Sequence, residues 1–167
     1  MRIGIIGAGQ LGQMLGFAAR AQGYTCCFLD PGEDPPAARI GPVIQARFDD
    51  RVALSVLAEK CDVVTYEFEN VPVDALEGVA DLVPIYPPLD GLRQAQDRLQ
   101  EKRLFTALDI PIPGYRRVDS PADLRDAAAS LGLPLVVKTR RLGYDGKGQV
   151  VLRDEQQVDA VWGELGG

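Results

Sequence analysis

Apolar positions along the N-terminal half of the chain follow two spacings, one typical of strands and one typical of helices. Short apolar runs that end at glycine or proline predict strands, and apolar residues three or four positions apart predict helices. The predicted strands span residues 2–6, 24–29, 43–44, 63–66 and 82–85. The predicted helices between them span residues 10–21, 52–59 and 73–79, and the first carries Leu11, Met14, Leu15 and Ala18 on one face. Because strands joined by crossover helices pair in parallel, the pattern predicts an α/β fold with an open parallel sheet.

The pattern changes after Pro84, Pro87 and Pro88, which interrupt the alternation of strands and helices. The elements expected beyond them are a long polar helix over 89–108, a strand at 115–118, a helix at 120–131, a hairpin of strands 133–137 and 150–152, and a last helix over 154–166. We therefore expect a complete α/β domain over residues 1–90, a connector helix over 91–109, and the beginning of a second domain over 110–167.

Composition narrows the possible function classes. The net charge of −6, from 18 basic and 24 acidic residues, argues against a general affinity for nucleic acid. The chain has no histidine, which excludes imidazole as a base or metal ligand within it. Cys26, Cys27 and Cys61 lack the spacing of a metal site, and the first two are typical of a buried strand. The apolar opening is broken by Gly7 and Gly9, so it predicts neither a signal peptide nor a membrane span and favours a cytoplasmic protein.

A glycine-rich, basic loop separates the two strands of the predicted hairpin. It contains the glycines Gly143, Gly146 and Gly148, the cations Lys138, Arg140, Arg141 and Lys147, and the carboxylate Asp145. Glycines let backbone N–H groups approach an anion closely, and the cations supply the charge that phosphate oxygens attract. Lys138 also ends an apolar strand, where a cation needs an anionic partner. The loop therefore predicts a site for the phosphates of a nucleoside triphosphate.

A second glycine motif follows the first predicted strand. Residues 7–12 read Gly-Ala-Gly-Gln-Leu-Gly, and Asp30 ends the second strand, where a ribose-binding acid lies in dinucleotide-binding folds. Two interpretations remain open for this motif. It is either a site for NAD(P) or only the tight turn that a doubly wound sheet requires.

Acidic and amide side chains follow the strand at 63–66. Because ligands of open α/β sheets bind outside the carboxyl edge, Glu67 and Asn70 are candidates for substrate contact. The alternative is ordinary turn chemistry, since Asn-x-Pro suits a loop. Further along, the pairs Asp97-Arg98 and Glu101-Lys102 are interpreted, from the residues alone, as a solvated helix face with ion pairs.

Several motifs match one enzyme family over nearly the whole chain. They lie at residues 7–14, 30–31, 63–72, 96–98 with 101–102, and 138–141 with 143–149. In this order they resemble the N-terminal part of the N5-carboxyaminoimidazole ribonucleotide synthetases, PurK-type members of the ATP-grasp superfamily. The run Gly-Tyr-Asp-Gly-Lys-Gly-Gln after a strand lysine is far more specific than the first glycine motif.

The resemblance implies a pre-ATP-grasp, Rossmann-like domain followed by the start of an ATP-grasp domain. It implies that Gln10, Leu11 and Glu67 contact the ribonucleotide, and Asn70 stays a further candidate from the sheet edge. The implied ATP-binding residues are Arg98, Lys138, Gly143, Tyr144, Asp145, Gly146, Lys147, Gly148 and Gln149. Of these, Tyr144, Asp145 and Lys147 are implied to face the reacting centre and to act in catalysis.

The implied reaction is the ATP-dependent carboxylation of 5-aminoimidazole ribonucleotide by bicarbonate, through carboxyphosphate, in purine biosynthesis. ATP and Mg²⁺ are the implied cofactors, the partners are these small molecules, and the full-length protein is implied to be a homodimer. Nucleic acid and membranes are not expected partners. In the family the Mg²⁺ ligands and the adenine hinge lie beyond the loop, so we expect no metal ligand here. We expect the chain to be a fragment that is inactive alone.

Three alternatives stay open from the sequence. The first is an NAD(P)-binding oxidoreductase domain, supported by residues 7–12 and Asp30, which leaves the loop at 138–149 without a role. The second is a ligand-binding module without enzymatic activity. The third is a related glycinamide ribonucleotide transformylase of the ATP-grasp class, against which Tyr144 and Asp145 before Gly146 favour the carboxylating family.

Overall fold

The computed structural model describes residues 1–143 and 146–165. The chain forms two compact units, Met1–Arg93 and Gln94–Gly167, and each is described here by itself. None of the helices in the described part of the chain could span a membrane.

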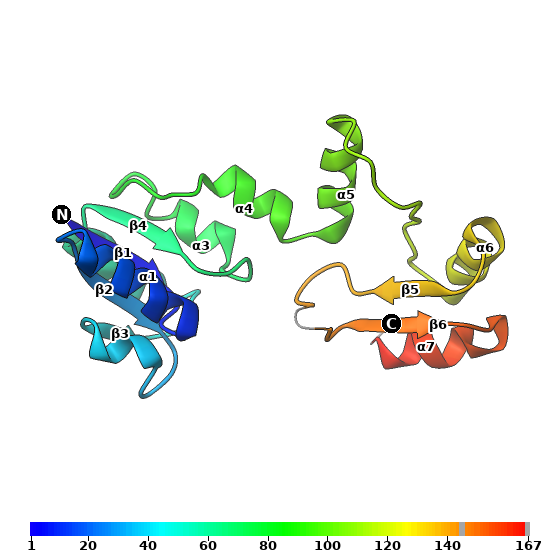
Figure 1. Ribbon diagram of the computed structural model, residues 1–167, viewed down its shortest axis with the longest axis horizontal. Helices are drawn as coiled ribbons and strands as arrows, with labels where there is room; N and C mark the ends of the chain where they lie inside the picture. Colours follow the sequence, from blue (N-terminus) through cyan, green and yellow to red (C-terminus); the bar gives the residue numbers. More distant parts are fainter. Residues whose placement is uncertain (144–145, 166–167) are drawn as a thin grey trace. The chain divides into compact units, whose positions relative to one another are not determined.

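The first unit is built on a parallel sheet of four strands in the order β3-β2-β1-β4 (Figure 1). The strands are β1 (Arg2–Ile6), β2 (Thr25–Asp30), β3 (Val43–Gln45) and β4 (Val63–Tyr66). In the centre, Gly4 of β1 pairs with Cys27 of β2 on one side and with Val64 of β4 on the other. The prediction of an open parallel sheet is confirmed.

Helices cover both faces of this sheet. They are α1 (Gln10–Ala21), η1 (Pro36–Arg39), α2 (Arg51–Lys60), α3 (Val73–Glu77) and α4 (Leu89–Ala95). Because successive side chains of a strand point to opposite faces, Ile5 and Phe28 enter the core beside α1 and η1, whereas Ile6 and Leu29 enter the core beside α2 and α3. Both faces of the central strands are therefore buried, which explains their continuous apolar runs.

Helix α1 packs on the sheet through its smallest residues. Gly12, Gly16 and Ala19 are its buried positions, and a Cβ on Gly16 would lie 2.8 Å from Cγ2 of Ile40. The larger apolar face expected from the sequence stays open, with Leu11 56% and Met14 65% exposed. Close approach of the helix backbone to the sheet thus decides which face is buried, rather than side-chain hydrophobicity.

The second unit combines a hairpin with helices. Its elements are α5 (Arg98–Ala107), α6 (Pro121–Leu131), β5 (Leu135–Lys138), β6 (Gln149–Leu152), η2 (Glu155–Gln157) and α7 (Val158–Glu164). Strands β5 and β6 pair antiparallel, as the sequence predicts. Helices α6 and α7 supply Leu124 and Val161 to a core that also contains Leu152 of β6. The hairpin therefore buries one face against helices.

Two predicted strands are reduced or absent in the structure. The strand expected at 82–85 is reduced to one bridge between Val64 and Ile85, in which Val64 N–H donates to Pro84 O over 2.9 Å. Proline itself has no N–H to extend the ladder. The strand expected at 115–118 is absent from the described part of the second unit, whose only ladder is β5 with β6. Two of its four residues, Arg116 and Arg117, are charged.

The single helix expected over 89–108 is also wrong, because the chain breaks between α4 and α5. Asp97 adopts an extended conformation there, and its carboxylate accepts hydrogen bonds from the N–H groups of Leu99 and Gln100. Asp97 therefore lies between the end of α4 and the start of α5, and its side chain caps α5.

Gly12→Ala is expected to destabilise the first unit by about 2–3 kcal/mol, because the added Cβ would lie 2.4 Å from the carbonyl oxygen of Gly7. Urea unfolding measures this loss. The matched control is Gly91→Ala in α4, where nothing lies within 4 Å of the new Cβ. Alanine there is expected to add about 0.5–1 kcal/mol through helix propensity. Equal effects of the two substitutions would contradict the close approach of α1 to the turn.

Candidate substrate edge and phosphate loop

Glu67 occupies the space above the first glycine turn. The residue follows β4 and its N–H donates to Ile6 O over 3.2 Å, which ties it to the end of β1. Its Oε2 accepts a 2.9 Å hydrogen bond from Gly12 N–H at the start of α1. Gly7 has a φ of +100°, and a Cβ there would lie 2.4 Å from Cγ and Oε1 of Glu67. Glycine at this position thus provides both the backbone conformation and the room for the glutamate.

Asp30, at the end of β2, binds the same turn from the neighbouring strand. Its Oδ2 accepts a 2.8 Å hydrogen bond from Ala8 N–H, and its Oδ1 accepts another of 2.8 Å from Gly32 N–H. In dinucleotide-binding folds the N–H groups of this turn and helix start face a pyrophosphate. Here two carboxylates already bind them. The arrangement does not favour the NAD(P) alternative.

Burial raises the pKa of Glu67, the nearby negative charge of Asp30 adds to this, and hydrogen bonds from the N–H groups of Gly12 and Gly9 act in the opposite direction. The carboxyl group therefore keeps a proton to higher pH than an exposed glutamate does. A half-buried carboxyl of this kind is suited to hydrogen-bonding the hydroxyl or amine groups of a ligand.

The other substrate candidates lie on the segments that follow β1 and β4. Gln10 and Leu11 are exposed at the first turn of α1, and Gln10 borders a hollow of about 280 Å³. Its remaining lining residues are Gln13, Asp34, Pro35, Pro36 and Arg39. Asn70 is half-buried and donates from Nδ2 to Oε1 of Glu69 over 3.4 Å. Gln10, Leu11 and Glu67 thus lie at one edge of the sheet.

In the second unit, backbone contacts close the base of the loop between β5 and β6. Thr139 N–H donates to Gly148 O over 2.8 Å. Gly148 has a φ of +67°, and a Cβ there would lie 2.5 Å from Oγ1 of Thr139. The loop therefore needs glycine at this position to close.

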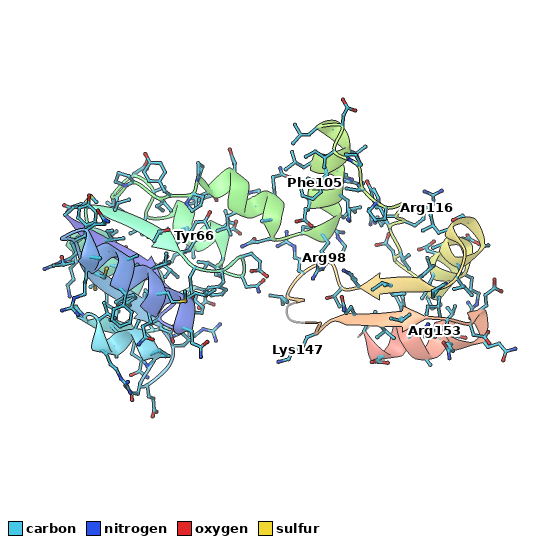
Figure 2. All side chains as sticks on the ribbon, in the orientation of Figure 1. Tyr66, Arg98, Phe105, Arg116, Lys147 and Arg153 are labelled. Atoms are coloured by element: carbon cyan, nitrogen blue, oxygen red, sulfur yellow. The ribbon has the colours of Figure 1, made fainter. Side chains whose placement is uncertain are left out.

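Arg98 holds the loop from the start of α5. Its guanidinium donates to Gly143 O over 3.0 Å, and its N–H donates to Arg140 O over 3.0 Å. Figure 2 shows Arg98 beside the loop and Lys147 near the start of β6. The side chain of Lys138 is exposed at the end of β5, whose register pairs Lys138 with Gln149. Arg98 thus joins the loop to a helix terminus.

Asp97 is the buried charged residue that organises this region. Only 3% of the residue is exposed. It caps α5, accepts a 3.2 Å hydrogen bond from Nε of Arg140 and a second bond from the same guanidinium, and lies 3.7 Å from Nε of Arg141. Burial opposes ionisation, but the hydrogen bonds from Arg140 and from Leu99 N–H outweigh it and lower the pKa of Asp97.

Sequence reasoning missed the role of Asp97 by assigning it to a solvated face. The signal was present, since Asp97 is followed by Gln100, the spacing of an N-terminal capping box. Tyr144 and Asp145, expected at the reacting centre, lie outside the described residues. Gly146 and Lys147 are exposed. Among residues 1–143 and 146–165, no three Cys, Asp or Glu side chains group as metal ligands.

Glu67→Gln is expected to change how stability depends on pH. Because the folded-state pKa of Glu67 is raised above its ordinary 4.5, the wild-type carboxyl contributes most below that pH and loses its contribution as the pH rises through the folded value. Glutamine does not ionise, so the variant should gain stability relative to wild type from pH 4.5 upward. Urea unfolding at several pH values measures the difference. Glu59→Gln, an exposed change on α2, serves as control, and identical pH profiles for all three proteins would contradict the burial of Glu67.

Asp97→Asn is expected to lower the free energy of unfolding of the second unit by about 1.5–3 kcal/mol, because the buried charge-assisted bonds to Arg140 are lost. Asparagine still caps a helix, so the cap itself is preserved. The matched control is Asp50→Asn, because Asp50 caps α2 by accepting from the N–H groups of Val52 and Ala53. The control should cost less than about 0.5 kcal/mol. A loss at position 97 no larger than the control's would refute the organising role of Asp97.

Comparison with known proteins gives relatives over the whole chain. It is 49% identical to an N5-carboxyaminoimidazole ribonucleotide synthase of Pseudomonas aeruginosa over 99% of this chain and 46% of the relative. A Staphylococcus aureus N5-carboxyaminoimidazole synthetase solved with ADP superposes with a TM-score of 0.93 at 39% identity, over 98% of this chain and 44% of that one. The Aspergillus clavatus enzyme, solved with ADP and aminoimidazole ribonucleotide, superposes with a TM-score of 0.87 at 30% identity, over 98% and 43%. The chain thus spans a little under half of these proteins.

The family models divide the chain in the same way. Residues 1–96 match the ribonucleotide synthetase preATP-grasp domain, and residues 103–167 match the ATP-grasp domain. The glycine turn with Glu67 lies in the first match, and the basic loop lies in the second. The chain therefore belongs to the ribonucleotide synthetase preATP-grasp family, with N5-carboxyaminoimidazole ribonucleotide synthases among its relatives, and continues into an ATP-grasp domain.

Proposed function

We propose that this chain is part of an ATP-grasp ligase that carboxylates 5-aminoimidazole ribonucleotide. Bicarbonate, ATP and the ribonucleotide would give N5-carboxyaminoimidazole ribonucleotide, ADP and phosphate. The observation that carries the proposal is the position of Glu67, which packs against Gly7 and accepts a hydrogen bond from Gly12 N–H. A half-buried carboxyl thus lies where a dinucleotide-binding fold would bind pyrophosphate. The relatives described above support the same assignment.

The first unit would bind the ribonucleotide at the carboxyl edge of its sheet. Glu67 would accept hydrogen bonds from hydroxyl or amine groups, and the exposed start of α1 would present Gln10 and Leu11. Asn70, which follows on the same segment, is the remaining candidate. Because Glu67 and Asp30 already hold the N–H groups of the turn, phosphate is not the group expected there.

The second unit would bind the phosphates of ATP through its basic loop. Arg98 and Lys138 would contact phosphate oxygens, and the backbone of Gly143, Gly146 and Gly148 would let the loop approach them. Gln149 begins β6 and pairs with Lys138 at the base of the loop. Such a site would position the phosphates and neutralise their charge, which is what phosphoryl transfer requires of a protein.

In the proposed reaction, a bicarbonate oxygen attacks the γ-phosphorus and ADP leaves, which gives carboxyphosphate. The ribonucleotide amine then attacks the carboxyl carbon, phosphate leaves, and the amine loses a proton. We assign Tyr144, Asp145 and Lys147 to this centre, with the Asp145 carboxylate to orient or deprotonate the amine. Mg²⁺, when bound, would neutralise charge on the phosphates of ATP, and we propose that its protein ligands lie beyond the basic loop, as the family resemblance implies.

We further propose that the longer protein is a homodimer, as the family resemblance implies. The cytoplasmic location and the division into residues 1–90, 91–109 and 110–167 stay predictions from the sequence pattern. A role in purine synthesis is supported by a further relative, a bifunctional purine synthesis protein of Dictyostelium discoideum.

The proposal predicts that phosphate release from ATP by the longer protein requires bicarbonate and is strongly accelerated by aminoimidazole ribonucleotide. Glu67→Gln should lower kcat/KM for the ribonucleotide by about tenfold or more, because a charged hydrogen-bond partner is lost, with little change in KM for ATP. The exposed change Glu59→Gln should leave both values unchanged. Phosphate release is followed in a coupled assay. Phosphate release that the ribonucleotide does not accelerate, or a full rate for Glu67→Gln, would overturn this assignment.

Experiments on the 167-residue chain distinguish the proposed ligase from the NAD(P)-binding oxidoreductase alternative. We expect no saturable binding of NADH by fluorescence titration, because carboxylates already fill the turn. We also expect no ATP turnover by this chain alone. Saturable NADH binding would instead support the oxidoreductase alternative, and normal turnover would show that the rest of the longer protein is not needed.

A further inference from the structure

Two cysteine side chains share the space above a glycine in the centre of the first sheet. Gly4 of β1 pairs in register with Cys27 of β2, so their side-chain positions point to the same face. A Cβ on Gly4 would lie 3.2 Å from Sγ of Cys61, which follows α2 directly. The side chains of Cys27 and Cys61 therefore meet over β1 because Gly4 has no side chain of its own.

The packing on this face agrees with that placement. Cys27 is 2% exposed and belongs to the apolar core beside α2, and Cys61 is a half-buried neighbour of the same core. Leu57 and Val64 surround the same point, since each lies close to the Cβ position of Gly4. The thiol pair is thus part of the core, and Cys61 is its member nearest the solvent.

Cys26 lies on the other side of the sheet, although it precedes Cys27 directly in the sequence. Its side chain belongs to the separate core formed with α1 and η1. It therefore has no route to Cys61 without unfolding of β2. This residue is a natural control for any chemistry of the pair.

The two thiols also differ in their affinity for a proton. A hydrogen bond from Cys61 lowers the pKa of Cys27 to about 7, against the effect of burial, and the nearby charges of Lys60 and Arg2 act in the same direction as the hydrogen bond. The same hydrogen bond, together with burial, raises the pKa of Cys61. A thiolate beside a retained thiol is the arrangement from which disulfides form.

We propose that Cys27 and Cys61 are a redox-active thiol pair that hydrogen peroxide converts into an internal disulfide. This is a modification site separate from the proposed carboxylation chemistry and does not depend on it. The bond would join β2 to the segment between α2 and β4 across β1. Strands β1 and β4 lead directly to the glycine turn and to Glu67.

The chemistry balances with peroxide as the oxidant. The Cys27 thiolate attacks one peroxide oxygen, an S–O bond forms, the O–O bond breaks, and hydroxide leaves and takes up a proton as water. The sulfur of Cys61 then attacks the sulfenic sulfur of Cys27. An S–S bond forms, the S–O bond breaks, and the hydroxyl group leaves with the proton of Cys61 as a second water. The two sulfurs together lose two electrons, which reduce one peroxide.

The test treats the folded 167-residue chain with hydrogen peroxide and counts free thiols under denaturing, non-reducing conditions. Of the three thiols, one should remain, and peptide mapping should place the disulfide between Cys27 and Cys61. Reduction by dithiothreitol should restore all three. The oxidised protein should melt about 5–10 °C above the reduced protein, because the bond restricts the unfolded chain.

Matched variants decide whether the pair itself is responsible. Cys26→Ser should form the disulfide at the wild-type rate, whereas Cys27→Ser and Cys61→Ser should form no internal disulfide. Cys61→Ser should instead accumulate sulfenic acid at Cys27 that dimedone traps, and Cys27→Ser should not, because it lacks the reactive thiolate. Cys27→Ala replaces Cys27→Ser if the hydroxyl disturbs the core. Three free thiols after peroxide treatment, a disulfide that involves Cys26, or a disulfide only between two chains would each overturn the proposal.

Discussion

The contact between the Glu67 carboxylate and the N-terminus of α1 is the constraint on which the first unit depends. It links the ends of two neighbouring strands, β1 and β4, to the start of α1. The contact requires glycine at Gly7, where any side chain would meet Glu67, and at Gly12, where a side chain would meet the carbonyl group of Gly7. The glycine motif is therefore explained by a carboxylate of the same chain before any ligand is considered.

In the second unit, too, a carboxylate binds the start of a helix, but here it also holds an arginine of the basic loop. Asp97 caps α5 and at the same time holds Arg140, so one buried carboxylate fixes both a helix start and the base of the loop. The adjacent Arg98 then reaches Gly143 with its guanidinium. Capping carboxylates next to glycine-rich segments are thus what positions the candidate residues in each unit.

The sequence predicted most of the fold because strand and helix periods are strong local signals. The β1–α1–β2 start, the parallel sheet and the β5–β6 hairpin all follow from such signals. The break at Asp97 and the exposed face around Met14 could not be predicted in this way, because each depends on a particular backbone contact rather than on the spacing of apolar residues. Glu67 was predicted from its position at the carboxyl edge of the sheet and Arg98 from the family motifs, whereas the bond of Glu67 to Gly12 required the structure.

The charges around the two glycine segments explain why similar motifs would bind different groups. At residues 7–12 the positive end of α1 is already neutralised by Glu67, and Asp30 binds the turn beside it, so an added phosphate would meet two carboxylates. At residues 138–148 the glycines are flanked by Lys138, Arg140, Arg141 and Lys147 instead. Glycines therefore provide room for close approach in both segments, and the neighbouring side chains determine the charge of the ligand group that can bind there. Under the proposed function, phosphate would therefore bind to the second unit and the uncharged groups of the substrate to the first.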